Sequence, residues 1–425
     1  MLHEEIAFSL FMCYNAFVNN IFQIERAIIM KKALMYGAGN IGRGFIGQLF
    51  HMSGYEISFI DVNMAVIDKL NTDGQYPVYI TDGDDYREYL VTGVHGVNGR
   101  DNEAIAEAMA EADIMATAVG VNILKFIAAP FAAGVRRRME KGIDAPLNVI
   151  ICENMIEADK YFAGLVKANL TEEEAKYFDS HIALVEPSIG RMVPATPKEI
   201  AEKNPLAVCV EPYCELPVDK HGFKGEIPEI KNMVPFAPFD FFIRRKLFMH
   251  NMSHALTAYF GALRGYTYIW EAVLDPDIRD LASKALGEAS AALNIEYGVP
   301  MDELRAFSDN LIERFENKLL GDTIERVGRD TKRKLSVNDR FVGVALLCEK
   351  LGIPAPTITA GLAAGLHFAP EGDDASIEVA GDAKANGVFH ALSTYCGLAE
   401  DSAIAKAVNE LYAKIGANTP ISELL

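Results

Sequence analysis

A lysine, an asparagine and a histidine stand close together in one helical stretch, RRKLFMHNMSHAL at residues 244–256. Oxidising an alcohol by hydride transfer needs a base that takes the hydroxyl proton and donors that hold the oxygen as charge develops. In a regular helix, at roughly 100° per residue, Asn251 lies about 140° and His254 about 80° around from Lys246. A long lysine can therefore share one pocket with both residues. Taken singly, each is more commonly structural, so periodicity alone does not assign catalysis.

A glycine-rich loop, GAGNIG, follows a short apolar strand and opens a helix. In this pattern Gly37 permits a tight turn, Gly39 lets the backbone approach a pyrophosphate, and Gly42 lets the helix pack closely on the sheet. The helix N-terminus, which includes Asn40 and Ile41, offers free N–H groups to the phosphates. The context of strand, loop and helix predicts a dinucleotide-binding site.

Two further positions belong to the same predicted site. Asp61 ends the next strand, 19 residues after Gly42, where an acid binds the ribose hydroxyls and repels a 2′-phosphate. We therefore expect NAD rather than NADP as the cofactor. Thr117 and Val119 follow another apolar strand, at the edge where doubly wound sheets bind ligands, so we expect them to line the cofactor site.

The elements that must position these residues change type along the chain. Short apolar strands are predicted at 55–60, 91–94, 114–118, 147–152 and 181–185, with helices between several of them. Long helical segments follow at 244–262, 277–297, 301–315, 337–351 and 357–367. The sequence thus predicts an α/β protein: a Rossmann-type doubly wound sheet at residues 30–230, then a mostly α-helical substrate and catalytic domain at residues 231–425.

Composition narrows the class of protein. A chain of 425 residues is long enough for two domains, and its net charge of −19, spread along the chain, argues against nucleic-acid or anionic-membrane partners. Its six cysteines form no CxxC pair, so we expect neither a metal site nor disulfides, but reduced thiols in the cytoplasm. We expect a monomer or a small homo-oligomer.

The first 29 residues are apolar but interrupted by charged and amide residues, so they do not predict a membrane span, and they lack the features of a signal peptide. We interpret residues 1–29 as an extension that is poorly ordered or arises from an upstream start codon. A helix packed on the surface is the alternative.

Several segments resemble the mannitol dehydrogenase family of polyol-specific long-chain dehydrogenases. The spacing Lys246-x4-Asn251-x2-His254 matches the active-site motif of that family. Other segments look like its mannitol-1-phosphate 5-dehydrogenase branch: GAGNIGRGF at 37–45, TAVG at 117–120, CENM at 152–155, RRKLFMHNMSHALTAYF at 244–260, RF and Asn at 314–317, and ERVGRDTKRKLSVNDR at 325–340. They span nearly all of residues 30–368 in the expected order.

The resemblance implies roles for four residues. Lys246 would be the general acid/base, Asn251 and Asn154 would hold the reacting oxygen, and His254 would contact or orient the substrate. A lysine base that works near neutral pH needs a lowered pKa, and we expect burial and the neighbouring charges of Arg244 and Arg245 to lower it.

The substrate is less closely defined. A basic cluster at residues 326–340 suits phosphate or carboxylate, and the resemblance makes Arg329, Arg333 and Lys334 candidates for gripping a substrate phosphate; a solvated loop or a set of ion pairs is the alternative. Many family members carry an aspartate where this chain has Gly190, and Glu186 is a candidate replacement.

The order of preference for the reaction is mannitol 1-phosphate/fructose 6-phosphate, then a hexuronate such as fructuronate or tagaturonate with its aldonate, then free mannitol through a 2-dehydrogenase activity. A non-catalytic NAD(H)-sensing protein is the alternative from another class. It is disfavoured because a sensor needs only the cofactor loop, whereas this chain also has Lys246, Asn251, His254 and Asn154.

Overall fold

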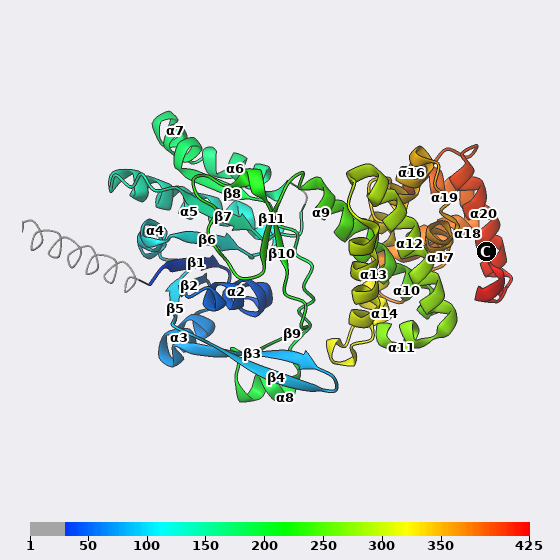
Figure 1. Ribbon diagram of the computed structural model, residues 1–425, viewed down its shortest axis with the longest axis horizontal. Coiled ribbons are helices and arrows are strands. Elements are labelled where there is room, and N and C mark those ends of the chain that lie inside the picture. The colour runs from blue at the N-terminus through cyan, green and yellow to red at the C-terminus, as the bar shows by residue number, and fades with distance from the viewer. Residues whose placement is uncertain (1–29, 156) are drawn as a thin grey trace, which may run out of the picture.

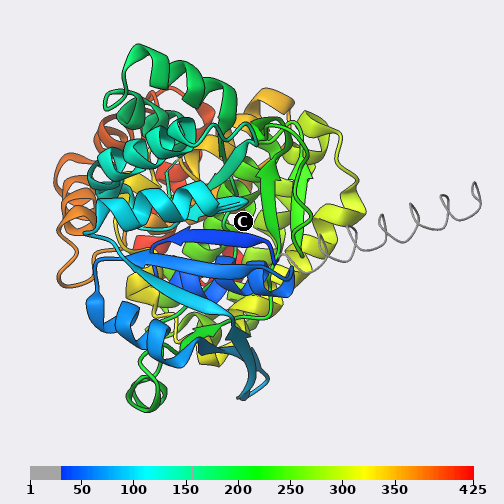
Figure 2. The same cartoon turned by 90° about the vertical axis from the view of Figure 1, so that its left-hand side faces the viewer.

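The computed structural model describes residues 30–155 and 157–425. The predictions for residues 1–29 lie outside the described residues. Figure 1 shows an α/β domain on the left and a helical domain on the right, and Figure 2 turns the molecule so that the α/β domain faces the viewer. Within the described ranges, no helix combines the length and the apolar character that crossing a membrane requires.

The first domain is built on a six-stranded sheet in the order β5-β2-β1-β6-β7-β8, with every neighbouring pair parallel. Its strands are β1 Lys32–Tyr36, β2 Glu56–Asp61, β5 Val94–Asn98, β6 Ile114–Thr117, β7 Leu147–Ile151 and β8 Ile182–Val185. The chain turns back beside β1, and ligands bind at such a reversal in doubly wound sheets. This arrangement confirms the predicted Rossmann-type fold.

Helices cover both faces of this sheet because successive side chains of a buried strand point to opposite sides. Leu34 and Tyr36 pack on one face with α4, α5, α6 and α7, and Ala33 and Met35 pack on the other with η1 and α2. The bounds are η1 Gly42–Gly47, α2 Gln48–Met52, α3 Met64–Asp73, α4 Asn102–Glu111, η2 Val121–Ile123, α5 Leu124–Glu140, α6 Ala158–Lys167, α7 Glu172–His181, α8 Lys198–Lys203 and η3 Lys220–Gly222.

Two small sheets complete the first domain. One has the order β4-β3-β9 and contains a hairpin, with β3 Gln75–Asp82, β4 Asp85–Thr92 and β9 Val208–Val210; the other pairs β10 Leu216–Asp219 with β11 Met233–Phe236. The prediction of one strand at 91–94 was wrong, because that stretch holds the end of β4 and the start of β5, with Gly93 between them at φ 65°.

The second domain is helical throughout its described elements. They are α9 Asp240–Arg245, η4 Lys246–Asn251, α10 Met252–Leu263, α11 Ile269–Leu274, α12 Pro276–Tyr297, α13 Met301–Phe315, η5 Lys318–Leu320, α14 Ile324–Gly328, α15 Thr331–Lys334, α16 Val342–Leu351, α17 Pro356–Gly365, α18 Asp374–Asn386, α19 Val388–Cys396, α20 Ala403–Gly416 and η6 Ile421–Glu423. The helix predicted at 301–315 is confirmed. The one predicted at 337–351 begins only at Val342, since a turn through Arg340 precedes it.

Helix α10 is the centre of this domain. It contacts α11, α12, α14 and α17, and most of its side chains are buried. The residues at its N-terminal end are therefore held by packing on several sides, as a catalytic constellation requires.

Candidate active site

The helix that carries Lys246 runs without a break from α9 through η4 into α10, but its middle turn, Lys246–Asn251, is π-helical. Hydrogen bonds in such a turn join residues five positions apart, and π-helical turns are frequent at functional sites. Residues five apart then lie one turn above each other, which places Asn251 on the side of the helix that carries Lys246. The separation of about 140° expected for a regular helix was wrong for this pair.

Lys246 lies in an environment that disfavours its charge. Burial and the nearby guanidinium of Arg340 lower the pKa of its amine to about 8. Arg340 is itself buried, and its Nη1 lies 3.4 Å from the carbonyl oxygen of Asn251. The lowered pKa is the property that a lysine needs to exchange a proton near neutral pH.

The expected source of the neighbouring positive charge was wrong. Arg244 forms an ion pair with Asp240 at 3.0 Å, and Arg245 forms one with Glu215 at 3.0 Å. The charge that acts on Lys246 comes instead from Arg340, which is distant in the sequence.

His254 follows on the first turns of α10. Its ring stacks on Phe315 with centroids 4.6 Å apart, and its Nε2 lies 3.4 Å from Oδ2 of Asp322. Burial and the charge of Arg326 lower the pKa of His254 well below its usual value, so the imidazole is neutral at neutral pH. His250 is buried nearby and its pKa is lowered in the same way, by burial and by Arg314.

Asn154 lies just beyond the carboxyl end of β7 and is exposed. Its neighbour Glu153 is buried and accepts the backbone N–H groups of Val119 at 2.9 Å and Gly120 at 2.7 Å. Glu153 thereby ties the end of β7 to the turn after β6. Sequence reasoning missed this residue, although it lies inside the quoted CENM segment. Within the described part of the chain, no hydrogen bond joins Asn154 to Lys246.

The glycine loop has the shape that a dinucleotide needs. Gly37 has φ 104°, and a Cβ there would lie 2.4 Å from the carbonyl oxygen of Ala118. A Cβ at Gly42 would lie 2.0 Å from the carbonyl oxygen of Gly37. Gly39 is exposed, and a Cβ there would meet no atom within 4 Å, which is the open space that a pyrophosphate would occupy.

The remaining predicted cofactor residues lie around this loop. Asp61 accepts the N–H of Ala38 at 2.8 Å, so the acid is held beside the loop. Asn40 is exposed and Ile41 is half-buried at the start of the helix. The glycine loop and Asp61 thus have a geometry that fits the cofactor site predicted from the sequence.

Thr117 and Val119, which were predicted to line the cofactor site, differ in the polar groups that they leave available. The hydroxyl of Thr117 is buried and has no hydrogen-bond partner among the described residues, so a polar group is still available there. The N–H of Val119 is already bound by Glu153, so it is not available to a cofactor, and the Val119 side chain is half-buried.

The three residues predicted to bind a substrate phosphate differ in their exposure and in their partners. Arg329 is exposed. Arg333 is exposed and paired with Asp330 at 2.8 Å and Asp339 at 3.3 Å, as the ion-pair alternative expects. Lys334 is buried, donates to the carbonyl oxygen of Val327 at 2.6 Å, and has its pKa lowered to about 7 by burial and the charge of Arg340.

A buried ion pair that the sequence did not indicate joins the two domains. Arg314 of α13 donates from Nε and Nη2 to the two carboxylate oxygens of Glu211, each at 2.7 Å, and both side chains are buried. Nη2 also donates to the carbonyl oxygen of Gly190 at 2.6 Å. The guanidinium lies 4.1 Å above the ring of Tyr213. A local pattern cannot reveal it, because its partners lie in different domains.

The position of Gly190 is therefore close to this ion pair. A Cβ there would lie 3.2 Å from Cε1 of Tyr213, so the tyrosine ring occupies the space toward which a side chain would point. Glu186, the suggested replacement acid, accepts the backbone N–H of Glu157 at 3.1 Å.

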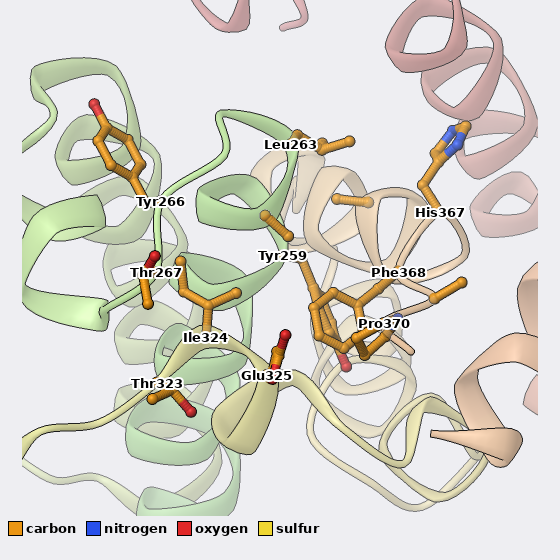
Figure 3. A pocket seen from close by; sticks show the side chains of 13 residues that line it. Tyr259, Leu263, Tyr266, Thr267, Thr323, Ile324, Glu325, His367, Phe368 and Pro370 are labelled. Atoms are coloured by element: carbon orange, nitrogen blue, oxygen red, sulfur yellow. The ribbon is translucent and has the colours of Figure 1, made fainter. Parts of the chain in front are cut away.

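A separate cavity of about 420 Å³ lies in the helical domain. Figure 3 shows Tyr266 and Thr267 on one side of it and His367 on the other. It is lined from α10, α14 and the end of α17, and it contains none of the predicted site residues. The candidate site is therefore at the other end of α10, near Lys246.

Comparison with known proteins identifies the family and supports the fold. Residues 31–232 match the model of the mannitol dehydrogenase Rossmann domain, and residues 239–421 match that of the mannitol dehydrogenase C-terminal domain. A D-sorbitol dehydrogenase in substrate-free form is 16% identical with a TM-score of 0.77, over 92% of this chain and 94% of that one.

Mannitol 2-dehydrogenase from Pseudomonas fluorescens, solved with NAD and D-mannitol, is 15% identical with a TM-score of 0.69, over 94% of each chain. At these identities the two structures support the fold, and the two family models cover nearly all of the described residues. The chain belongs to the mannitol dehydrogenase family of oxidoreductases.

Proposed function

We propose that this chain is an NAD-dependent dehydrogenase that interconverts mannitol 1-phosphate and fructose 6-phosphate, with Lys246 as the general acid/base. One observation carries the proposal: Lys246 and Asn251 are the first and last residues of one π-helical turn, and burial together with Arg340 lowers the pKa of the Lys246 amine to about 8. A base with a pKa near the working pH is the most effective one.

In the oxidation direction, the neutral amine of Lys246 takes the proton of the substrate hydroxyl. The amides of Asn251 and Asn154 donate hydrogen bonds to the oxygen as it becomes a carbonyl. Bound NAD would accept the hydride and return it in the reverse reaction. In reduction, the protonated Lys246 gives its proton to the new hydroxyl, while Asn251 and Asn154 hold the carbonyl oxygen.

An anionic substrate is favoured by the charges around His254. Arg326, Lys334, Arg314 and Arg340 all act on its titration, in a chain whose net charge is −19. Arg314, Arg326 and Arg340 are paired with Glu211, Asp322 and Asp339. Among the described residues, Lys334 has no carboxylate within ion-pair distance and binds only a carbonyl oxygen. We propose that Lys334, with Arg329 and Arg333 nearby in sequence, receives the phosphate.

A hexuronate is the second candidate substrate, and the surroundings of Gly190 favour it. The ring of Tyr213 lies where many family members direct an acid, so this chain lacks that negative charge near the site. A carboxylate on the substrate would be compatible with that change.

An assay of NADH oxidation tests the proposal. The purified chain is presented with fructose 6-phosphate, fructose, fructuronate and tagaturonate, and each reaction is repeated in reverse with NAD and the matching alcohol or acid. Selective turnover of fructose 6-phosphate is expected. Activity on a hexuronate alone replaces the substrate but keeps the lysine mechanism, whereas NADH binding without turnover of any sugar supports a sensor and contradicts the proposal.

A further inference from the structure

His254 and Asp322 form a pair unlike the other histidine–carboxylate pairs in the described residues. Their side chains are only 13% and 7% exposed. The pairs His95–Glu56, His390–Asp382 and His181–Asp144 each have at least one partner that is more than half exposed. A buried histidine–carboxylate pair next to a reacting centre is a means of fixing an imidazole.

Both members of the pair are held in place. The His254 ring is stacked on Phe315 with an interplanar angle of 11°. Asp322 is bound through Oδ1 by Arg326, and its backbone carbonyl accepts the N–H of Ile269 at 2.9 Å. Ring plane and carboxylate are therefore both fixed before a substrate arrives.

The two facing atoms have only each other. Nε2 of His254 and Oδ2 of Asp322 are buried, and neither has a hydrogen-bond partner among the described residues. Their separation of 3.4 Å is longer than an ordinary hydrogen bond. Such contacts at active sites are often long without substrate and shorten in the complex. Leaving a buried polar group without a partner destabilises the protein, so shortening of this contact is favourable.

The charge state of His254 decides what the contact does. The imidazole is neutral, because burial and four nearby cations lower its pKa. One ring nitrogen then carries the proton and the other accepts. A carboxylate facing Nε2 places the proton there. Because Nε2 is buried while 13% of the side chain is exposed, the exposed part of the side chain excludes Nε2.

We propose that Asp322 is a positioning residue that holds the proton of His254 on Nε2, so that Nδ1 accepts a hydrogen bond from a substrate hydroxyl. This rests on the proposed function for the identity of the substrate as a polyol or its keto sugar. The tautomer itself does not depend on which sugar binds.

The substitution Asp322→Asn gives a sharp test. The amide oxygen can still accept from Arg326, so the amide nitrogen turns toward His254 and donates to Nε2. The proton of the imidazole must then move to Nδ1, as in the aspartate-to-asparagine exchange of serine protease triads. The shape of the site is retained and only the direction of one hydrogen bond is reversed.

The direct readout is nitrogen NMR of the full chain labelled with 15N-histidine, with the His254 signals assigned through His254→Gln. The wild type is expected to show the Nε2–H form and Asp322→Asn the Nδ1–H form. A wild-type Nδ1–H form overturns the proposal, and this measurement needs no variant at Asp322 to fold.

Kinetics provide the second readout. Asp322→Asn is expected to lower kcat by about 10- to 100-fold with unchanged NADH affinity and melting temperature. The matched control is Glu56→Gln, which removes the carboxylate facing His95 at 2.8 Å on the protein surface and should leave kcat unchanged. A tautomer or a kcat that stays as in the wild type overturns the proposal. Absence of turnover by the wild type on every sugar would instead refute the proposed function and leave the tautomer assignment standing.

Discussion

Arg340 contacts the π-helical turn of Lys246 at its last residue, with Nη1 3.4 Å from the carbonyl oxygen of Asn251. The contact brings a permanent positive charge close enough to the Lys246 amine to lower its pKa, in addition to the effect of burial. The guanidinium of Arg340 stays charged at every working pH, and it lowers the pKa of a lysine amine that titrates in this range.

The first prediction concerns the pH profile of Arg340→Gln. Alcohol oxidation needs the neutral amine, so kcat/KM for oxidation should rise with pH through about 8 in the wild type. Removing the positive charge raises the pKa of Lys246, and the rising limb should move to higher pH. Carbonyl reduction needs the protonated amine, so its falling limb should move in the same direction.

Arg244→Gln is the matched control for that profile. Arg244 is adjacent to the site in sequence but is paired with Asp240, and it does not contribute to the pKa shift of Lys246. Its profile should match that of the wild type. If the pH profile shifts with Arg244→Gln and not with Arg340→Gln, then Arg244, as expected from the sequence, is the residue that lowers the pKa of Lys246.

Two alanine substitutions in the glycine loop should separate binding from stability. Gly39→Ala places a methyl group in open space, so the melting temperature should be retained while NADH affinity falls. Gly42→Ala places one 2.0 Å from the carbonyl oxygen of Gly37, and should cost about 1–3 kcal/mol of stability. Fluorescence titration with NADH and thermal unfolding measure the two effects. Equal NADH affinity in Gly39→Ala and the wild type would place the pyrophosphate elsewhere.

Lys334 should make the binding of a phosphorylated substrate depend on pH. Its pKa is about 7, and only the protonated amine attracts an anion, so KM for fructose 6-phosphate should rise as pH increases above 7. Lys334→Met should remove this dependence and raise KM for fructose 6-phosphate more than for fructose. Arg333→Gln is the comparison. If only Arg333→Gln raises KM for fructose 6-phosphate more than KM for fructose, the phosphate is held by Arg333 despite its ion pairs.

The ion pair between Glu211 and Arg314 should be important for stability. Removing one member of a buried pair leaves an uncompensated charge and costs about 3–5 kcal/mol. Glu211→Ala should therefore lower the free energy of unfolding in guanidinium titrations by that amount. Glu103→Gln removes an exposed partner of Arg137 and should cost less than about 1 kcal/mol. Similar losses in the free energy of unfolding in the two variants would show that the buried pair stabilises the protein no more than an exposed one does.

The sequence predicted the geometry of the glycine loop because its determinants are local. The turn at Gly37, the space at Gly39 and the acid at Asp61 all follow from one strand, one loop and the next strand. The hairpin of β3 and β4 was not predicted, because β4 lacks a clear local signal in the sequence. Most side chains of β4 are exposed, so the strand has no apolar face to produce a pattern.

The candidate catalytic site was only partly predictable. Hydrophobic periodicity does not distinguish a π-helical turn within a longer helix. A regular helix was therefore assumed, and the predicted angle between Asn251 and Lys246 around the helix axis was too large. Arg340 and Asp322 reach the site through tertiary packing, from segments far from the lysine in sequence. The residues were visible, but their mutual geometry depends on contacts that no local spacing specifies.

The most direct test of the account is the turnover of Lys246→Ala on the best substrate of the sugar panel, measured together with its NADH affinity. Loss of the general acid/base should lower kcat by about 10²- to 10⁴-fold, while NADH affinity and melting temperature remain at the wild-type values. A Lys246→Ala chain that retains near-normal turnover would contradict the lysine mechanism.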